Sequence, residues 1–141
     1  MKTKLLFVLS VTLIAAPCSR GADEHPAAPA TNLAATKAKK VDVEEFDKLR
    51  QNKANVVLDV RTEAEFKTAH IPGAVNIDVN GPDFAAKVAK LDKGKTYLVH
   101  CAAGRRSASA GAKLTAVGFT NLFDLAPGFK GWEAAGKPTE K

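Results

Sequence analysis

The sequence of 141 residues is poor in cysteine and in the larger aromatic residues, with two cysteines, one tryptophan and one tyrosine. Its lysines are scattered, so the formal net charge of +6 forms no basic stripe with interleaved aromatics, and we expect no nucleic-acid partner. The cysteines and the three histidines show no metal-ligand spacing, and no nucleotide-type phosphate-binding loop is present. We therefore expect no metal and no cofactor.

Long hydrophobic runs are also missing beyond the first residues of the chain, so we expect a soluble mature domain. Lys2 and Lys4 precede an apolar run at residues 5–16, which is shorter than the roughly 20 residues of a membrane-spanning helix but typical of a signal peptide. We expect residues 1–21 to be an export signal. That signal would place the protein in the periplasm of a Gram-negative cell or in an equivalent outer space.

The end of this signal allows two forms of processing. Residues 15–18, with the sequence Ala-Ala-Pro-Cys, resemble the lipobox of bacterial lipoproteins, in which the cysteine, here Cys18, is lipidated and tethers the protein to a membrane. Proline fits that motif poorly, and ordinary cleavage between Cys18 and Ala22 is the alternative. In both cases Cys101 has no pairing partner in an oxidising compartment, which points to a reactive thiol rather than a disulfide.

Residues 22–40 are rich in alanine, proline, threonine and lysine and lack periodicity, which is typical of a disordered tether. The folded domain is expected over residues 41–138, where apolar runs alternate with segments of helical periodicity. Strands are expected at residues 56–60, 74–77, 96–100 and 121–124, and helices at residues 43–50, 63–68, 84–91, 107–117 and 129–135. This alternation predicts one α/β domain with a mainly parallel sheet and helices on both faces.

Cys101 directly follows the predicted strand at residues 96–100, and sites in such folds lie beyond the carboxyl ends of strands. Ser107 is expected to cap the next helix. The residues of the loop between them are Ala102, Ala103, Gly104, Arg105 and Arg106. This order aims the thiol into backbone N–H groups at a helix N-terminus, which stabilise anions. An ordinary buried cysteine is the alternative, but the glycine and paired arginines favour a nucleophilic thiolate with a lowered pKa.

Four stretches of the sequence form a pattern together that none forms alone. They are Leu58-Asp59-Val60-Arg61 with Glu65-Phe66, His70-Ile71-Pro72-Gly73-Ala74-Val75-Asn76-Ile77, the run from Cys101 to Ser107, and Gly118-Phe119 with Trp132, Gly136 and Pro138. In this order they resemble the rhodanese family of sulfurtransferases over roughly residues 41–138. The resemblance implies a five-stranded α/β domain whose catalytic cysteine, here Cys101, cycles through a persulfide.

The resemblance also implies roles for the residues that follow Cys101. The thiolate would take the sulfane sulfur of thiosulfate or a related donor and pass it to cyanide or a thiol. Amides of residues 102–107 would cradle the terminal sulfur, with Gly104 allowing the tight turn. Arg105 is expected to attract the anionic donor. Arg106 is expected to tie the loop to an acid such as Asp59 or Glu63.

Other polar residues near the site are expected to be structural. Asp59 and Arg61 should make scaffold hydrogen bonds at a strand end, and His70 should shape a turn with the proline and glycine that follow it. His100 should point away from Cys101 because neighbouring strand residues face opposite sides. In the turn before the last helix, proline stands where many members of the family have a glycine.

Two alternatives to a sulfurtransferase remain open. Related folds hold phosphate in a cysteine loop with an arginine six residues after the cysteine. Here Ser107 holds that position, so the loop is one residue too short and a phosphatase is disfavoured. A non-enzymatic sulfur carrier or protein-interaction module would have a similar loop, although an intact loop argues against an inactive module. We expect a monomeric enzyme that acts on a small-molecule donor and acceptor.

Overall fold

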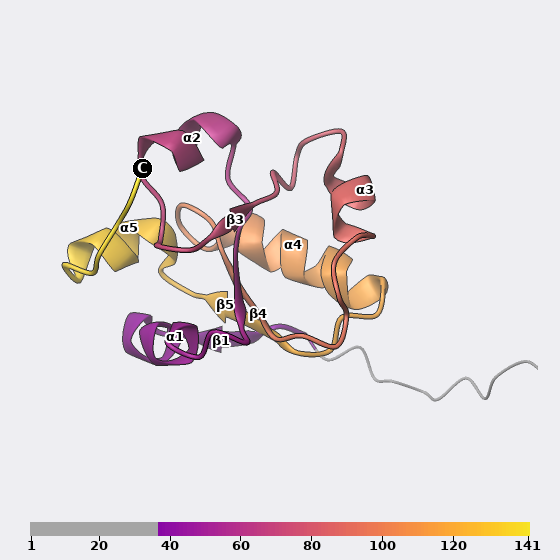
Figure 1. Ribbon diagram of the computed structural model, residues 1–141, viewed down its shortest axis with the longest axis horizontal. Coiled ribbons are helices and arrows are strands. Elements are labelled where there is room, and N and C mark those ends of the chain that lie inside the picture. The colour runs from indigo at the N-terminus through magenta and orange to yellow at the C-terminus, as the bar shows by residue number, and fades with distance from the viewer. Residues whose placement is uncertain (1–36) are drawn as a thin grey trace, which may run out of the picture. The chain divides into compact units, whose positions relative to one another are not determined.

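Five short strands form the centre of residues 37–141, the part of the chain that the computed structural model describes (Figure 1). The strands are β1 (Lys39–Val41), β2 (Val56–Asp59), β3 (Val75–Asn76), β4 (Tyr97–His100) and β5 (Leu122–Leu125). Their order in the sheet is β1-β5-β4-β2-β3, and every neighbouring pair is parallel. The predicted parallel α/β architecture is confirmed. The predicted export signal at residues 1–21 lies outside the described residues.

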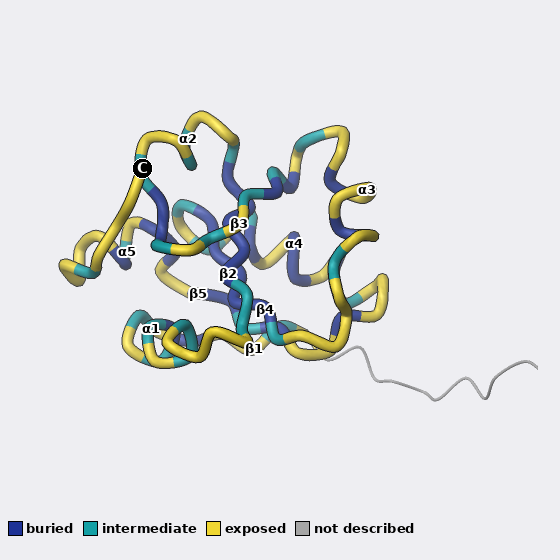
Figure 2. The backbone as a smooth tube through the Cα atoms, in the orientation of Figure 1, coloured by how far each residue is buried: buried dark blue, intermediate teal, exposed yellow. Residues whose placement is uncertain are grey.

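Helices cover both faces of this sheet. They are α1 (Val43–Arg50), α2 (Glu63–Thr68), α3 (Phe84–Val88), α4 (Arg105–Ala116) and α5 (Gly128–Ala134). Consecutive strand residues point to opposite faces. Leu58 packs in a core cluster with Leu114 of α4, and its neighbour Val57 packs in a second cluster with Trp132 of α5. The central strand β4 is buried along its whole length, as the dark tube in Figure 2 shows. No helix in residues 37–141 is long and apolar enough to cross a membrane.

The described structure extends past both predicted ends of the domain. β1 begins at Lys39, so the predicted tether is wrong at its last two residues, while its residues 22–36 lie outside the described part. Lys39 and Lys40 are exposed, and their place in the sheet comes from parallel pairing with β5 rather than from hydrophobicity. At the other end, Glu140 pairs with His70 in an isolated antiparallel bridge.

The helix that follows Cys101 begins earlier than predicted. α4 begins at Arg105, and its N-cap is Gly104, whose φ of +85° lies in the left-handed region that favours glycine. Ser107 is therefore not the cap. Its side chain is buried in the first turn, where Oγ donates a hydrogen bond to the carbonyl oxygen of Gly104 at 3.1 Å. The turn at Gly104 directs the N-terminus of α4 toward Cys101.

Candidate active site

Cys101 is the first residue after β4, and its thiol faces the N-terminus of α4. Its Sγ accepts a hydrogen bond from the backbone N–H of Gly104 at 3.1 Å, and the residue is buried. Burial raises the pKa of the thiol. Hydrogen bonds from Ser107 and from the backbones of Ala103 and Gly104 outweigh burial, so the pKa of Cys101 is lowered from its ordinary value. The single hydroxyl proton of Ser107 is donated to the Gly104 carbonyl, so the thiolate is stabilised mainly by backbone N–H groups.

The carbonyl groups of the same loop are turned the other way, toward α5. Phe129 N–H donates to the Cys101 carbonyl at 2.7 Å, and Lys130 N–H donates to the Ala102 carbonyl at 3.0 Å. Gly128 makes this close approach possible, because a β-carbon there would lie 2.7 Å from backbone atoms of Ala102. With its first carbonyls held by α5, the loop presents N–H groups to the sulfur.

Proline before α5 does not disturb this arrangement. Pro127 is the N-cap of α5 at a φ of −78°, which the proline ring favours. Gly128 follows in the left-handed region at a φ of +64°. The departure from the family pattern therefore leaves the contact between α5 and the Cys101 loop intact.

Arg106 ties the loop to α2 through Glu65, and the predicted partners Asp59 and Glu63 are wrong. Its Nη1 and Nη2 donate to the two carboxylate oxygens of Glu65, each at 2.7 Å. Asp59 is occupied by Arg61, and Glu63 pairs with Lys67 on the exposed side of α2. The N–H and the hydroxyl of Thr62 also donate to the Glu65 carboxylate. Hydrogen bonding from Arg106 is the main cause that lowers the pKa of Glu65 to about 2, against the opposing effect of burial.

Arg105 differs from its neighbour. It is exposed, and it makes no ion pair or side-chain hydrogen bond within residues 37–141. Ala103 is exposed and Ala102 is half-buried. The outer surface of the loop therefore consists of two methyl groups and one guanidinium that is free to meet an anion.

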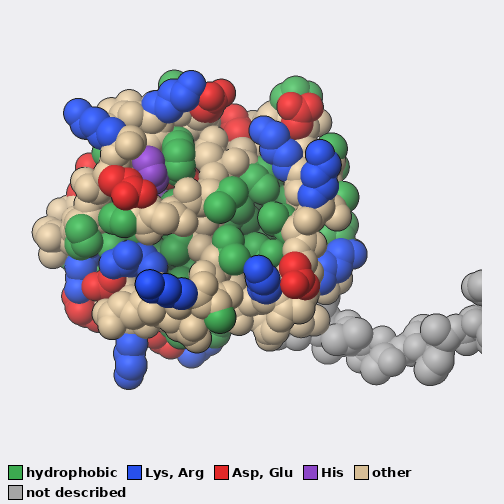
Figure 3. Space-filling model, in the orientation of Figure 1, with side chains coloured by type: hydrophobic (Ala, Val, Ile, Leu, Met, Phe, Trp, Pro, Cys, Tyr) green, Lys and Arg blue, Asp and Glu red, His purple; other side chains and the backbone are tan. Residues whose placement is uncertain are grey.

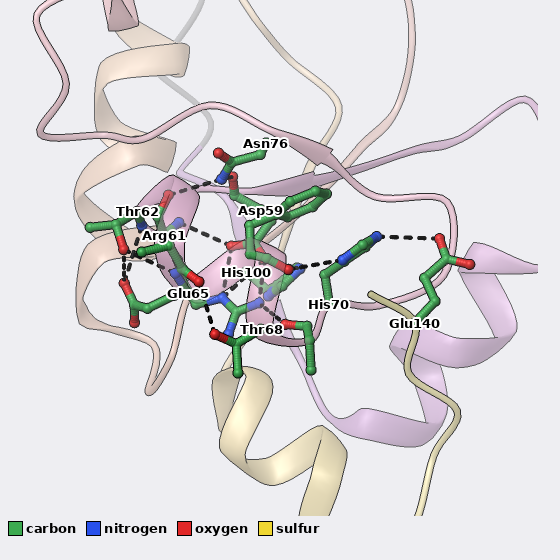
Figure 4. Close-up of polar contacts among 12 residues, drawn as sticks. Asp59, Arg61, Thr62, Glu65, Thr68, His70, Asn76, His100 and Glu140 are labelled. Atoms are coloured by element: carbon green, nitrogen blue, oxygen red, sulfur yellow. Dashed lines mark hydrogen bonds and ion pairs between the residues drawn. The ribbon is translucent and has the colours of Figure 1, made fainter.

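A buried ion pair supports the loop from the opposite face of the sheet (Figure 4). Arg61 Nη2 lies 2.6 Å from Asp59 Oδ2 and donates to the Ala69 carbonyl at 2.7 Å. The Arg61 guanidinium also lies 4.0 Å from the ring centroid of Phe129, whose N–H holds the Cys101 carbonyl. Asp59 and Arg61 thus reach the site through packing and do not contact Cys101 Sγ.

His100 points away from Cys101, into the cluster that contains Phe46 and Phe129. Its Nε2 lies 3.7 Å from Asp59 Oδ2, which is too long for a hydrogen bond. Neither ring nitrogen has a hydrogen-bond partner within the described residues. Burial is the largest cause that lowers the pKa of His100 to about 4. The ring is therefore neutral near pH 7.

His70 lies in the turn between α2 and β3 and is not brought to the loop. Its ring stacks on Phe66 with centroids 3.8 Å apart, and its Nε2 lies 3.3 Å from Glu140 Oε1 (Figure 4). Sequence reasoning missed Asp124, an acid at the buried end of β5 whose Oδ1 has no hydrogen-bond partner in residues 37–141. Burial raises the pKa of Asp124. An acid within an apolar strand is the signal that could have identified it.

The arrangement around Cys101 suits a nucleophile. Within residues 37–141 no group of three or more His, Cys, Asp or Glu side chains is placed to hold a metal ion. What the loop offers is a thiol of lowered pKa, converging amides and one exposed guanidinium. Such a site can attack an electrophilic atom and stabilise an anion that forms on the sulfur.

Comparisons with known proteins identify the family of this chain. The chain is 35% identical over 99 residues to the thiosulfate sulfurtransferase GlpE of Pseudomonas savastanoi pv. phaseolicola, covering 70% of this chain and 91% of that protein. It is 33% identical over 76 residues to the putative sulfur carrier protein YrkF of Bacillus subtilis, covering 54% and 40%. The solution structure of the rhodanese-like domain of Alr3790 from Anabaena matches with a TM-score of 0.64 and 27% identity, covering 72% and 77%. The family profile of the rhodanese-like domain matches residues 42–135, and the chain belongs to this family.

Proposed function

We propose that the protein is a sulfurtransferase that carries a sulfane sulfur as a persulfide on Cys101. The observation that carries this proposal is the Cys101 Sγ, whose lowered pKa results from N–H groups of the loop and of the first turn of α4. A thiolate at the start of α4 would be the attacking species near neutral pH. The names of relatives such as GlpE support the same reaction class.

The proposed reaction has two displacement steps. The Cys101 thiolate attacks the outer sulfur of thiosulfate, the S–S bond of the donor breaks, and sulfite leaves with the bonding electron pair. The enzyme then holds a persulfide anion, which the amides that support the thiolate can stabilise. Cyanide or a thiolate attacks the outer sulfur in turn, and the Cys101 thiolate returns. No external oxidant or base is required, because both attacking groups are anions.

Arg105 is the proposed donor-binding residue. Its guanidinium is exposed and unpaired within the described residues, so it can meet the sulfonate end of thiosulfate without first breaking an ion pair. Arg106 is bound to Glu65 and is proposed to position the loop. This division makes a phosphatase unfavourable, because the arginine nearest the required position is already held by a carboxylate.

Intact mass of the purified protein before and after thiosulfate tests the proposal directly. We expect a gain of one sulfur atom that cyanide removes as thiocyanate, and no gain in Cys101→Ser. Alkylation of Cys101 should also proceed at a pH below that needed for an ordinary thiol. Sulfur transfer in the Cys101→Ser protein, or Cys101-dependent hydrolysis of a phosphomonoester faster than sulfur transfer, would refute the proposal.

A sulfur carrier is the second candidate, and the similarity to YrkF favours keeping it. A carrier would load one sulfur on Cys101 from a persulfide donor but would show no steady turnover with thiosulfate and cyanide. Repeated thiocyanate formation per enzyme molecule separates the two functions, because only the sulfurtransferase returns to the free thiolate with these substrates.

We also propose that residues 1–21 direct export to the periplasm or an equivalent compartment, and that the mature protein is a monomer. The basic residues and the apolar run at the N-terminus support the export part of this proposal. Mass spectrometry of the protein from its native host should show a chain that begins between Cys18 and Ala22, with a lipid if Cys18 is modified. Recovery of the intact chain from the cytoplasm would contradict the proposal.

A further inference from the structure

An apolar groove lies between α3 and α4, away from the residues of the Cys101 loop. Figure 3 shows hydrophobic side chains gathered in a hollow where Figure 1 places these helices, with basic side chains and one acidic group along its border. The cavity measures about 890 Å³, which is within the range of about 300–1,000 Å³ typical of small-molecule sites. Its lining includes Phe84, Val88, Lys93, Lys113, Ala116 and Val117.

The groove leaves apolar surface without a cover. Val117, at the end of α4, is 48% exposed and is one of two large hydrophobic residues that are exposed within residues 37–141. Ala85 of α3, Ala89 just after it and Ala116 of α4 also line the groove, and their small side chains leave space in it. Phe84 contributes an aromatic ring to its wall. A single molecule with an apolar body fits such a surface.

The charged groups of the groove have one sign. Its lining contains Lys93 and Lys113 and no aspartate or glutamate. Lys113 Nζ donates to the Val79 carbonyl at 3.2 Å and lies 5.2 Å from the ring centroid of Phe84, so its ammonium is held beside the apolar wall. One protein acceptor leaves an ammonium two further N–H groups for a ligand. The groove is therefore complementary to a molecule with an apolar tail and an anionic head.

We propose that this groove binds one amphipathic anion of fatty-acid chemistry, with its carboxylate at Lys113 and its chain along Phe84 and Val88. The site is separate from the proposed sulfur transfer, because no residue from Cys101 to Ser107 lines it. Lys113 should contribute more than Lys93. The side chain of Lys93 lies beside Gly118 at the C-terminal end of α4, where backbone carbonyls already offset part of its charge.

A titration of the full mature protein with decanoate, followed by backbone-amide chemical shifts, tests the proposal. Decanoate is kept below its micelle concentration, and decyltrimethylammonium, which has a matched tail and a cationic head, is titrated in parallel. We expect saturable shifts at the residues of α3 and at the end of α4 with decanoate, and at least about threefold weaker binding of the cation, as for loss of a surface ion pair.

Three variants make the test specific. Lys113→Gln should weaken decanoate binding by about two- to fivefold, the range of a partly exposed ion pair. Ala116→Trp fills the groove from an exposed helix position and should abolish binding while thermal unfolding stays cooperative. Lys48→Gln, on the exposed side of α1, removes the same charge elsewhere and should leave binding unchanged.

Four results would overturn the proposal. They are no saturable shift with decanoate, equal binding of the cationic amphiphile, unchanged binding in a folded Ala116→Trp protein, and binding to anionic phospholipid vesicles without binding to monomeric decanoate. Sulfur transfer by the Ala116→Trp protein should equal that of the unaltered protein, so the outcome here is distinguishable from failure of the proposed function.

Discussion

Replacing Glu65 by glutamine should destabilise the protein by removing the anchor of Arg106. With its single oxygen in the place of Oε2, glutamine can still accept from Thr62 and from Arg106 Nη1 and keep the cap of α2. Its NH2 group would then face Arg106 Nη2, so that 2.7 Å hydrogen bond would be lost and the other would lose its charge. The pKa of Glu65 falls from 4.5 to about 2, and at about 1.4 kcal/mol for each pKa unit this corresponds to about 3 kcal/mol. The Glu65 side chain is 36% exposed, so solvent screening reduces the expected loss to about 1–2 kcal/mol.

The contribution of Glu65 to the free energy of unfolding should decrease as the pH falls. A carboxyl whose pKa is lower in the folded protein adds stability above its unfolded pKa and loses that contribution as the pH falls through its folded pKa. The contribution of Glu65 should therefore be complete above pH 4.5 and should decline between pH 4.5 and about 2. Urea unfolding of the unaltered and Glu65→Gln proteins measures their difference in stability at neutral pH and at about pH 3.

Sulfur transfer should fall together with stability, because Arg106 lies in the first turn of α4 beside the Cys101 loop. The fall should not exceed about thirtyfold, the effect of 2 kcal/mol lost entirely from the transition state. Glu63→Gln is the matched control, since Glu63 is on the same helix but makes an exposed pair with Lys67. Equal stability of the two variants at neutral pH, or a Glu65→Gln difference that does not shrink on acidification, would refute the reasoning.

Three further changes test other parts of the site. Arg105→Ala should lower kcat/KM for thiosulfate by about ten- to a hundredfold, the value of one charge-assisted hydrogen bond of about 1.5–3 kcal/mol. Gly128→Ala should destabilise the fold by about 2–4 kcal/mol in urea unfolding, because a β-carbon there adds left-handed strain and meets the backbone of Ala102 at 2.7 Å. His100→Phe should reduce the loss of stability on acidification. The pKa of His100 is about 4 in the folded protein, against 6.5 for a histidine exposed to water, so about 3 kcal/mol of stability present above pH 6.5 should disappear by pH 4 in the unaltered protein.

Each of these changes has its own control. Arg105→Lys keeps the charge and should restore part of the lost thiosulfate use, and full activity of the alanine variant itself would exclude a role for the guanidinium. Gly136 has the same left-handed backbone conformation, at a φ of +67°, but no atom lies within 4 Å of the added carbon. Gly136→Ala should therefore lower the stability less than Gly128→Ala. An identical change of stability with pH in the His100→Phe and unaltered proteins would contradict the assigned titration.

The elements that could be predicted are those whose signals are local. Asp42 caps α1 by accepting from the Glu45 N–H at 2.8 Å, and the helix then runs over residues 43–50 as expected. α2 also agrees, because Thr62 and Glu65 form a capping box within one turn. In each case the residues that define the boundary lie three positions apart.

The parts that could not be predicted depend on contacts between distant segments. Arg106 and Glu65 are 41 residues apart, and nothing local distinguishes Glu65 from Glu63 as the partner. β1 has two lysines in three residues, and only pairing with β5 makes it a strand. Serine is a common cap, so the sequence predicts that α4 starts at Ser107, whereas the backbone turn at Gly104 begins the helix earlier.

The attachment of the Cys101 loop to two helices has a consequence for how the family can change its chemistry. The loop after Cys101 leads directly into α4, and the carbonyls of its first two residues accept hydrogen bonds from α5. The length of the loop is therefore fixed by the distance between these two helices. To surround a larger anion, the loop after Cys101 would need an added residue together with a new turn before α5. A point substitution in the loop can therefore change the rate of sulfur transfer, but binding a larger anion requires an insertion.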